Sequence, residues 1–508
     1  MKLTIEEIIT AVGGSGAPGF DAVRPVSGIS TDTRTLRAGE AFFALSGENH
    51  DAHDHLAEAA GKGASLLVIS DVSKAPECGA GAAGVSGAAG EADGVGGAAP
   101  CVLLVEDTLR AYQDLAAYYR RRLDPFVIAV TGSVGKTTLK DMIACILSGH
   151  RRVCSTKGNL NNQIGVPRTI LEADEGTEAL VLEMGMERAG EIERLAEIAR
   201  PDICVISNIG ISHRGNFTSD EGIVRAKYEI SSYLGAGGSF VINASGSEAL
   251  LRYAEEGSAE KGFALVRVAE QGTAAELAAD YVVTAARVSG GDAREMHFEI
   301  EERKTGAAVP FAVPMAGTYA GVSAALASAV CARAGISLAE SAEALKGLNR
   351  TPHRLEPVSA GGVLVIDDTY NASPDSVKSG LDYLINVPAK RRIAVLADMN
   401  DLGPDSEALH FETGAAAAGA GVDSIFTFGE KARGIADGAL AGKSPGISDG
   451  KLQADERRIP VCCFGPGEKA ELLERLIDEV REGDAVYIKG SHSMKMEEVA
   501  KALKEARG

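Results

Sequence analysis

The sequence predicts an α/β protein of three domains in which helices cover mostly parallel sheets. Short apolar runs alternate with helical patterns along most of the 508 residues. Many of these runs have the length and apolarity of strands that are buried on both faces. A glycine-rich loop that contains a lysine and a threonine follows one such run and opens a helix. We expect domains at residues 1–107, 108–350 and 351–508.

Composition and charge narrow the class of protein. With 45% hydrophobic and 24% charged residues, a chain of this length is globular and too long for one core. A net charge of −20 argues against nucleic acid or an anionic membrane surface as a partner. The eight cysteines show neither zinc-site spacing nor a disulfide framework. No apolar run approaches the roughly 18 residues that cross a bilayer, so we expect a cytoplasmic protein without an integral membrane segment.

The first domain is predicted to be small and α/β. Its strands are expected at the apolar runs 41–45, 65–69 and 102–105. Between the last two lies a stretch, Lys74 to Pro100, that consists mostly of glycine and alanine. Such a composition cannot bury enough surface to offset the entropy of ordering, so this stretch is predicted to be a mobile insertion without chemistry.

The central domain is predicted to be doubly wound, with strands at 126–130, 179–184, 203–207 and 240–243. The glycine-rich loop follows its first strand, and we expect a helix at 139–147. Glycines allow backbone N–H groups to approach phosphate oxygens, the lysine adds a positive charge, and a threonine hydroxyl can ligate Mg²⁺. The alternative is a strand-to-helix turn that binds no nucleotide. The predicted ATP-phosphate site comprises Gly132, Ser133, Val134, Gly135, Lys136, Thr137 and Thr138.

Three further residues of this domain are weak signals when taken singly. Glu183 ends an apolar strand and is placed to bind a metal, but it could equally face solvent. His213 follows another strand, where a lone histidine is more often a polar loop residue. Lys227 stands in a helical pattern, and by itself it is read as a solvated helix lysine.

The third domain repeats the alternation of strands and helices. Strands are expected at 363–366, 393–396, 424–428 and 485–488, which predicts a Rossmann-like domain, although no G-x-G-x-x-G fingerprint is present. Ser373-Pro374-Asp375 is predicted to start a helix, with serine as the N-cap and proline at the first helical position. Asp368 could be a turn former at a strand end, and Lys489 could be the solvent-facing end of the last strand.

Together, these motifs resemble in order and spacing the Mur ligases, the ATP-dependent enzymes that build the peptide of bacterial cell-wall precursors. The resemblance covers nearly the whole chain, and it includes the nucleotide loop Thr131 to Thr138 and the loop Gly158 to Pro167. It implies two Mg²⁺ ions and a CO₂-derived carbamate on Lys227, which would turn a cation into a metal-binding anion. The metal ligands that it implies are Thr137, Glu183, His213 and carbamylated Lys227.

The same resemblance assigns substrate residues to all three predicted domains. It implies that the first domain binds the uridine nucleotide, that Arg354 reaches the γ-phosphate, and that Asp368 reaches the ATP ribose. Two departures from the family pattern are Ala52, where glycine is usual, and the segment Tyr319 to Ser323, which lacks the asparagines of the adenine side. Tyr319 could stack on a base. The implied substrate-binding residues are Ser30, Asp32, Arg34, Asp51, His53, Asn159, Asn161, Asn162, Asn371 and Ser373.

The activity that the resemblance implies is the ATP-dependent joining of D-alanyl-D-alanine to a UDP-N-acetylmuramoyl tripeptide through an acyl phosphate, by a monomer. Its implied catalytic residues are Lys136, Lys227, His213 and Arg354. One alternative is another Mur-type or folylpolyglutamate-type amino acid ligase. A second is a nucleotide-binding relative without catalysis, which only the altered Tyr319 to Ser323 segment supports.

Overall fold

The computed structural model describes residues 3–13, 15–16, 22–47, 50–75, 100–210, 217, 219–284, 287–289, 295–317, 319–400, 402–442, 445–448, 451–454 and 459–508. The chain forms two compact units. Unit 1 comprises Met1–Ile128, Arg151–Met184 and Arg194–Pro201. Unit 2 comprises Ala129–His150, Gly185–Glu193 and Asp202–Gly508. None of the helices among these described residues is both long and apolar enough to cross a membrane.

Unit 1 begins with a five-stranded sheet in the order β2-β7-β6-β5-β4. The neighbours β4, β5, β6 and β7 run parallel, and β2 pairs antiparallel with β7. Phe42, Leu56, Leu67 and Ile69 lie in the buried core beside this sheet. The elements are β1 (Leu3–Thr4), α1 (Ile5–Val12), β2 (Ser15–Gly16), β3 (Pro25–Val26), β4 (Ile29–Ser30), β5 (Ala41–Phe43), α2 (Leu56–Gly61), β6 (Leu66–Ile69) and β7 (Cys101–Leu104).

The rest of unit 1 continues from α3 (Thr108–Leu123), whose N-cap is Asp107. The strands β9 (Val153–Ser155) and β10 (Ala179–Glu183) run parallel. Between them lies α5 (Gly165–Glu172). The helix α6 (Glu191–Ala199) follows β10 and belongs to unit 1 from Arg194 onward. Tyr119 of α3 is buried and donates a hydrogen bond to the carbonyl of Ala173, 3.0 Å away. This bond ties α3 to the segment that follows α5.

Unit 2 starts within β8 (Phe126–Thr131) and continues a sheet in the order β8-β11-β12-β13-β14-β16-β15, with β17 paired to β16. The strands β11 to β14 are parallel, whereas β15, β16 and β17 pair antiparallel. The strands are β11 (Ile203–Ile206), β12 (Ser239–Asn243), β13 (Ala264–Glu270), β14 (Tyr281–Val283), β15 (Arg287–Ser289), β16 (Glu295–Glu302) and β17 (Ala307–Val313).

The helices of this part include one that is buried almost all round. Residues 320–331 of α9 are all buried, which is the pattern of a core helix rather than of an amphipathic one. It packs against α4, the helix that follows the glycine-rich loop. The helices are α4 (Lys136–Ser148), α7 (Asp220–Tyr228), α8 (Glu248–Lys261), α9 (Ala320–Ala332) and α10 (Leu338–Leu345).

Unit 2 ends with a six-stranded sheet in the order β18-β19-β25-β20-β21-β24. All neighbours are parallel except β18, which pairs antiparallel with β19. The strands are β18 (Glu356–Ala360), β19 (Val363–Asp368), β20 (Arg391–Ala397), β21 (Ser424–Phe428), β24 (Val461–Phe464) and β25 (Asp484–Lys489), and a separate hairpin joins β22 (Pro445–Ser448) to β23 (Lys451–Ala454).

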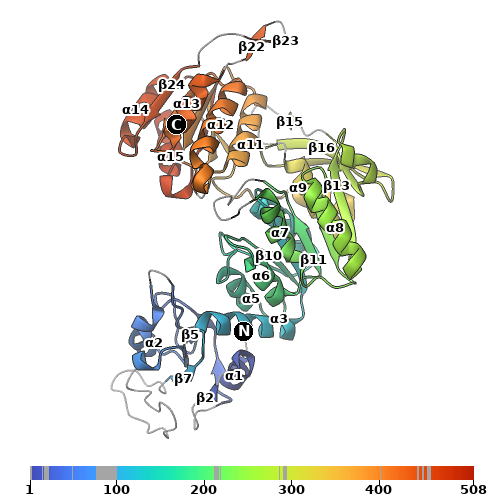
Figure 1. The fold of residues 1–508 in the computed structure, drawn as a ribbon, viewed down its shortest axis with the longest axis vertical. Coiled ribbons are helices and arrows are strands. Elements are labelled where there is room, and N and C mark those ends of the chain that lie inside the picture. The colour runs from blue at the N-terminus through green and yellow to red at the C-terminus, as the bar shows by residue number, and fades with distance from the viewer. Residues whose placement is uncertain are drawn as a thin grey trace. The chain divides into compact units, whose positions relative to one another are not determined.

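Helices cover both faces of this last sheet. Figure 1 shows α11 (Pro374–Asn386), α12 (Ser406–Gly419) and α13 (Ala432–Ala441) on one face, and α14 (Lys469–Glu479) and α15 (Glu497–Arg507) on the other. Two buried clusters match these layers, one with Leu381 and Ile435, the other with Leu472 and Leu503. The predicted doubly wound arrangement is therefore present.

The predicted α/β class is confirmed, and each predicted strand appears within a residue or two of its expected bounds. Strands that were not predicted include β9, β13 and β14 of the central sheet, its antiparallel strands β15 to β17, and the edge strands β18 and β24. The three domain boundaries stay a prediction. Of the predicted insertion, residues 76–99 lie outside the described residues.

Candidate active site

The phosphate loop joins β8 to α4 in unit 2. Gly132 and Gly135 have φ of 150° and 80°, where other residues are strained, and a Cβ at Gly132 would clash with the Ser207 hydroxyl. The loop is fastened to the end of β11: Val134 N–H donates to Asn208 Oδ1 at 2.8 Å, and Ser207 Oγ donates to the Val134 carbonyl at 2.6 Å. The fold therefore holds a preformed glycine loop at a helix N-terminus, as a polyphosphate requires.

The charge of this loop comes from Lys136, the first residue of α4. Its Nζ donates to the carbonyls of Gly132 and Ser133, at 2.9 and 3.2 Å. The ammonium therefore lies over its own loop. Thr137 is buried and Thr138 half-buried in the first turn of the same helix. The set fits a nucleotide phosphate, while the predicted contact between Thr137 and Mg²⁺ stays a prediction.

Lys227 of α7 is a second lysine at the same loop. Its side chain is only 2% exposed, and Nζ donates to the Gly132 carbonyl at 3.1 Å. The prediction from the sequence alone, that Lys227 is a solvated helix lysine, is thus wrong, because this face of α7 packs on the phosphate loop. Burial, aided by the nearby charge of Lys136, lowers the pKa of Lys227 well below its usual value. The unprotonated amine is the form that reacts with CO₂, and a lowered pKa favours this form, so the surroundings of Lys227 fit a carbamate.

In unit 1, the predicted metal ligand Glu183 ends β10 and is 2% exposed, which rules out the solvent-facing alternative. Its Oε1 accepts a hydrogen bond from Asn161 Nδ2 at 2.9 Å. Asn162 instead lies in the turn before α5, where its Oδ1 accepts from the N–H groups of Ile164 and Gly165. Asn159 is exposed. The structure therefore joins two of the predicted residues, Glu183 and Asn161.

The predicted uridine-binding residues form two local clusters in unit 1. In the first, Arg34 contacts both oxygens of Asp32 at 2.7 to 3.1 Å, and Ser30 Oγ donates to the Asp32 carbonyl. Arg34 lowers the pKa of Asp32 to about 2. In the second, buried His53 lies 2.6 Å from Asp51 through Nδ1. Their uridine role stays a prediction.

At the end of β19 and β25, Asp368 and Lys489 form a buried ion pair. Lys489 Nζ lies 2.5 Å from Asp368 Oδ2, and Lys489 is 3% exposed, so it is not a solvent-facing strand end. Asp368 also accepts from Tyr487 OH at 3.0 Å and from Leu355 N–H at 3.1 Å. Its carboxylate is held by protein donors on both oxygens, and the predicted ribose contact stays a prediction.

Other residues predicted in the third domain lie around the start of α11. Ser373 caps α11, with Pro374 at its first turn, as predicted. Asn371 is exposed, and its Oδ1 accepts from the Ala372 N–H. The Arg354 guanidinium lies 4.1 Å from the centre of the Tyr370 ring. All of these roles toward substrates stay predictions.

Tyr319, which precedes α9, packs against the core cluster around α11 and α12. Burial, with the nearby charge of Asp368, raises the pKa of its phenol. Whether a base stacks on this ring stays a prediction. His213 lies outside the described residues.

Sequence reasoning missed Asn208 and Asp375. Asn208 follows β11 directly and holds the phosphate loop, a role that a strand-end asparagine could have suggested. The Asp375 carboxylate lies against Gly210, which follows β11, a contact across many residues of sequence. No local pattern predicts such a contact.

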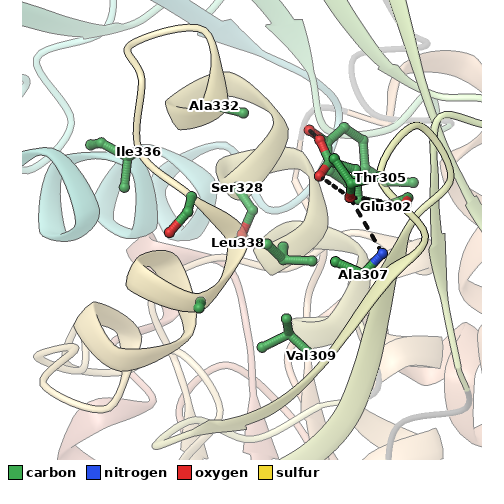
Figure 2. Close-up of a pocket in the computed structure, with 11 residues that line it drawn as sticks. Glu302, Thr305, Ala307, Val309, Ser328, Ala332, Ile336 and Leu338 are labelled. Carbon is green, nitrogen blue, oxygen red and sulfur yellow. Dashed lines mark hydrogen bonds between the residues drawn. The ribbon is translucent and has the colours of Figure 1, made fainter.

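One cleft of unit 2 lies apart from these residues (Figure 2). It measures about 290 Å³ and is lined mainly by apolar side chains of β17, α9 and α10, including Val309, Ala332 and Leu338. None of the residues lining it belongs to the phosphate loop. The cleft is therefore not part of the phosphate site described above.

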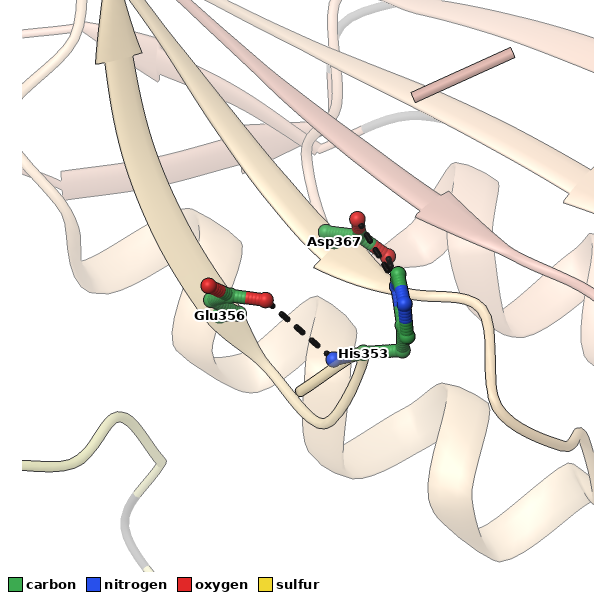
Figure 3. A group of neighbouring side chains, drawn as sticks. All are labelled: His353, Glu356 and Asp367. Atoms are coloured by element: carbon green, nitrogen blue, oxygen red, sulfur yellow. Dashed lines mark hydrogen bonds and ion pairs between the residues drawn. The ribbon is translucent and has the colours of Figure 1, made fainter. Parts of the chain in front are cut away.

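A cluster of His353, Glu356 and Asp367 brings three groups with metal-ligand chemistry within 4.8 Å of one another (Figure 3). Lys504 Nζ already pairs with Asp367 at 2.8 Å, and Thr369 donates to the same carboxylate at 2.7 Å. An ammonium thus neutralises the buried carboxylate, so the cluster is explained without a metal.

Comparisons with known proteins agree with this geometry. Residues 130–332 match the Mur ligase middle domain, and residues 353–492 match the Mur ligase glutamate ligase domain. The chain is 35% identical to the UDP-N-acetylmuramoyl-tripeptide–D-alanyl-D-alanine ligase of Bacillus subtilis (strain 168), covering 100% of this chain and 99% of the relative. It is 31% identical to the enzyme of the same name from Escherichia coli (strain K12), over 94% and 93% of the two chains.

A solved structure is also similar. The crystal structure of MurF from Acinetobacter baumannii superposes with a TM-score of 0.83 at 26% identity, covering 99% of each chain. Sequence similarity over the full length and similarity of fold point to the same group of proteins. The chain therefore belongs to the Mur ligase family of ATP-dependent ligases.

Proposed function

We propose that this ligase joins the amino group of D-alanyl-D-alanine to the terminal carboxylate of a UDP-N-acetylmuramoyl tripeptide, converting ATP to ADP and phosphate in peptidoglycan precursor synthesis. The names of its full-length relatives support the substrates. The observation that carries the chemistry is the pair of lysines, Lys136 and Lys227, on the one carbonyl of Gly132 in the phosphate loop. We place the reaction in the cytoplasm, and nothing in it requires a second copy of the chain.

Phosphoryl transfer is the first step. The tripeptide carboxylate attacks the γ-phosphorus, forming an oxygen–phosphorus bond while the bond to ADP breaks, and the product is an acyl phosphate. Both reactants are anions, so their repulsion and the charge of the transferred group must be neutralised. Lys136 and Arg354 supply positive charge, and the N–H groups of the loop from Gly132 to Thr138 hold the phosphates.

Amide formation is the second step. The neutral amine of the dipeptide attacks the acyl carbon, the carbon–oxygen bond to phosphate breaks, and the amine loses its proton. Water would hydrolyse the acyl phosphate, so the protein must exclude it. We assign the dipeptide to the region of Asn371 and Ser373, the tripeptide end to Asn159, Asn161 and Asn162, and the ATP ribose to Asp368. The uridine nucleotide is assigned to the domain at residues 1–107, through Ser30, Asp32, Arg34, Asp51 and His53.

We assign two Mg²⁺ ions to Thr137, Glu183, His213 and a carbamate on Lys227. When bound, Mg²⁺ neutralises phosphate charge and orients the γ-phosphate for in-line transfer. The carbamate forms when the neutral Lys227 amine attacks CO₂ and releases a proton. Burial without a carboxylate partner among the described residues supports this assignment, because it lowers the pKa of the amine and so favours its neutral form.

An ADP-release assay tests the function. We expect release only when ATP, the UDP-N-acetylmuramoyl tripeptide and D-alanyl-D-alanine are all present, with amide product equal to ADP. Lys136→Ala should abolish release while the protein stays folded, because the Lys136 ammonium supplies charge to the phosphates and is not part of an apolar core. Equal activity with single amino acids in place of the dipeptide would instead support a different Mur-type ligase.

A further inference from the structure

The segment that carries Arg354 has an unusual backbone. His353 and Leu355 flank Arg354 and have φ of 61° and 45°, in the left-handed region. Neither is glycine, and leucine in particular rarely adopts this conformation. Surrounding contacts must therefore hold the segment in place.

Carboxylates hold its backbone on both sides of Arg354. The His353 N–H donates to Glu356 Oε2 at 3.2 Å, and the Leu355 N–H donates to Asp368 Oδ1 at 3.1 Å. The Asp368 carboxylate is itself fixed by the ion pair described above. These bonds fix the direction in which the Arg354 side chain leaves the backbone.

The His353 ring adds a third restraint (Figure 3). Its Nδ1 lies 3.2 Å from each oxygen of Asp367, whose side chain is 1% exposed. Asp367 in turn pairs with Lys504 at 2.8 Å, and Lys504 belongs to the last helix, α15. A continuous series of contacts therefore leads from α15 to the residue that precedes Arg354.

Arg354 itself is stacked and not paired. Its guanidinium lies over Tyr370, and its Nε is buried without a hydrogen bond to any residue that the structure describes. Arg354 is half-buried, and a guanidinium in this position retains donors for an anionic ligand. The backbone contacts therefore restrain the position of a guanidinium that can still donate hydrogen bonds to a ligand.

We propose that His353, Asp367 and Lys504 are positioning residues that orient Arg354 toward the nucleotide phosphates. The last helix then contributes to ATP binding through the contact series Lys504, Asp367, His353. This rests on the proposed function and extends it, because it assigns a role to three residues outside the phosphate loop.

The test is ATP affinity, measured by isothermal titration calorimetry with the full chain. His353→Asn removes the ring contact but keeps a residue that tolerates left-handed φ, and the ring is 43% exposed, so folding should survive. Lys504→Met removes the far end of the series. Lys501→Met is the matched control, since Lys501 lies on the same helix with a side chain 77% exposed. We expect ATP to bind about tenfold more weakly to His353→Asn and to Lys504→Met, and with unchanged affinity to Lys501→Met.

A double-mutant cycle separates positioning from general loss of structure. In an Arg354→Ala background, His353→Asn and Lys504→Met should change ATP affinity less than about twofold, because the group that they orient is gone. Unchanged affinity in both single variants, or an equal loss in the Arg354→Ala background, would overturn the inference. Failure of the unmodified protein to bind ATP would instead overturn the proposed function itself.

Discussion

Two lysines of unit 2 are almost equally buried and have opposite surroundings. Lys489 of β25 is 3% exposed and pairs with Asp368 at 2.5 Å. Lys227 of α7 is 2% exposed and contacts a carbonyl of the phosphate loop, and its charged neighbour is another lysine, Lys136. A buried charge that is paired with an opposite charge is typical of a structural ion pair. A buried amine beside a like charge has a perturbed pKa, which is typical of a functional site.

The two lysines also differ in how their neighbours affect the pKa of the amine. Burial lowers the pKa of both amines, but Asp368 opposes this shift at Lys489. At Lys227 burial and the charge of Lys136 both lower the pKa, so the neutral form of the amine is favoured. The comparison therefore predicts that Lys489 matters for stability and Lys227 for activity.

The largest effect is expected for Lys227→Arg. A guanidinium cannot form a carbamate and stays cationic, so ADP release should fall about a thousandfold. Lys227→Ala should lose as much activity and regain part of it with added acetate, which can fill an anionic position. Lys261→Arg is the control, because Lys261 also donates to carbonyls, those of Ser231 and Ser232. Near-native activity of Lys227→Arg would contradict the carbamate.

Lys489→Met should mainly cost stability. It leaves the Asp368 carboxylate buried without its cation, which typically costs about 3 to 5 kcal/mol of unfolding free energy. Urea denaturation measures this loss. Adding Asp368→Asn should restore much of it, because the uncompensated charge is removed. A loss below about 1 kcal/mol would mean that the pair is not the stabilising feature described here.

Lys227→Met should change the pH dependence of stability. Since the pKa of Lys227 is lowered in the native state, the unfolded state binds more protons between that lowered pKa and the usual 10.5. Stability therefore rises with pH in this window, by at most about 1.4 kcal/mol per pH unit. Urea unfolding from pH 6 to 9 in CO₂-free buffer without Mg²⁺ should show this slope reduced in Lys227→Met. An unchanged slope would show that Lys227 is not held neutral.

The exposed pair Asp32–Arg34 should show the smallest effect. Arg34 has a side chain 86% exposed, and it lowers the pKa of Asp32 to about 2. A carboxyl group whose pKa is lowered in the folded state stabilises that state at pH values above the usual carboxyl pKa. This stabilisation is lost as the pH falls toward 2. Arg34→Gln should raise the Asp32 pKa in an NMR titration without a measurable change in unfolding free energy. A clear loss of stability in Arg34→Gln would contradict the expectation that exposed ion pairs contribute less to stability than buried ones.

The phosphate loop and the start of α11 could be read from the sequence because both depend on local geometry. Gly132 must avoid Ser207, and Ser373 with Pro374 forms a helix cap within a few residues. The burial of the two lysines could not be read in this way. Lys227 meets Gly132 across 95 residues, and Lys489 meets Asp368 across 121. Such burial depends on which surfaces pack together, and local patterns do not contain that information.

Carbon-13 NMR of the enzyme in ¹³C-bicarbonate at mildly alkaline pH tests the central claim most directly. A carbamate on Lys227 should give a single protein-bound signal that persists in Lys489→Arg, disappears in Lys227→Met, and is lost on acidification. A spectrum without such a signal, or a signal that survives Lys227→Met, would contradict the account.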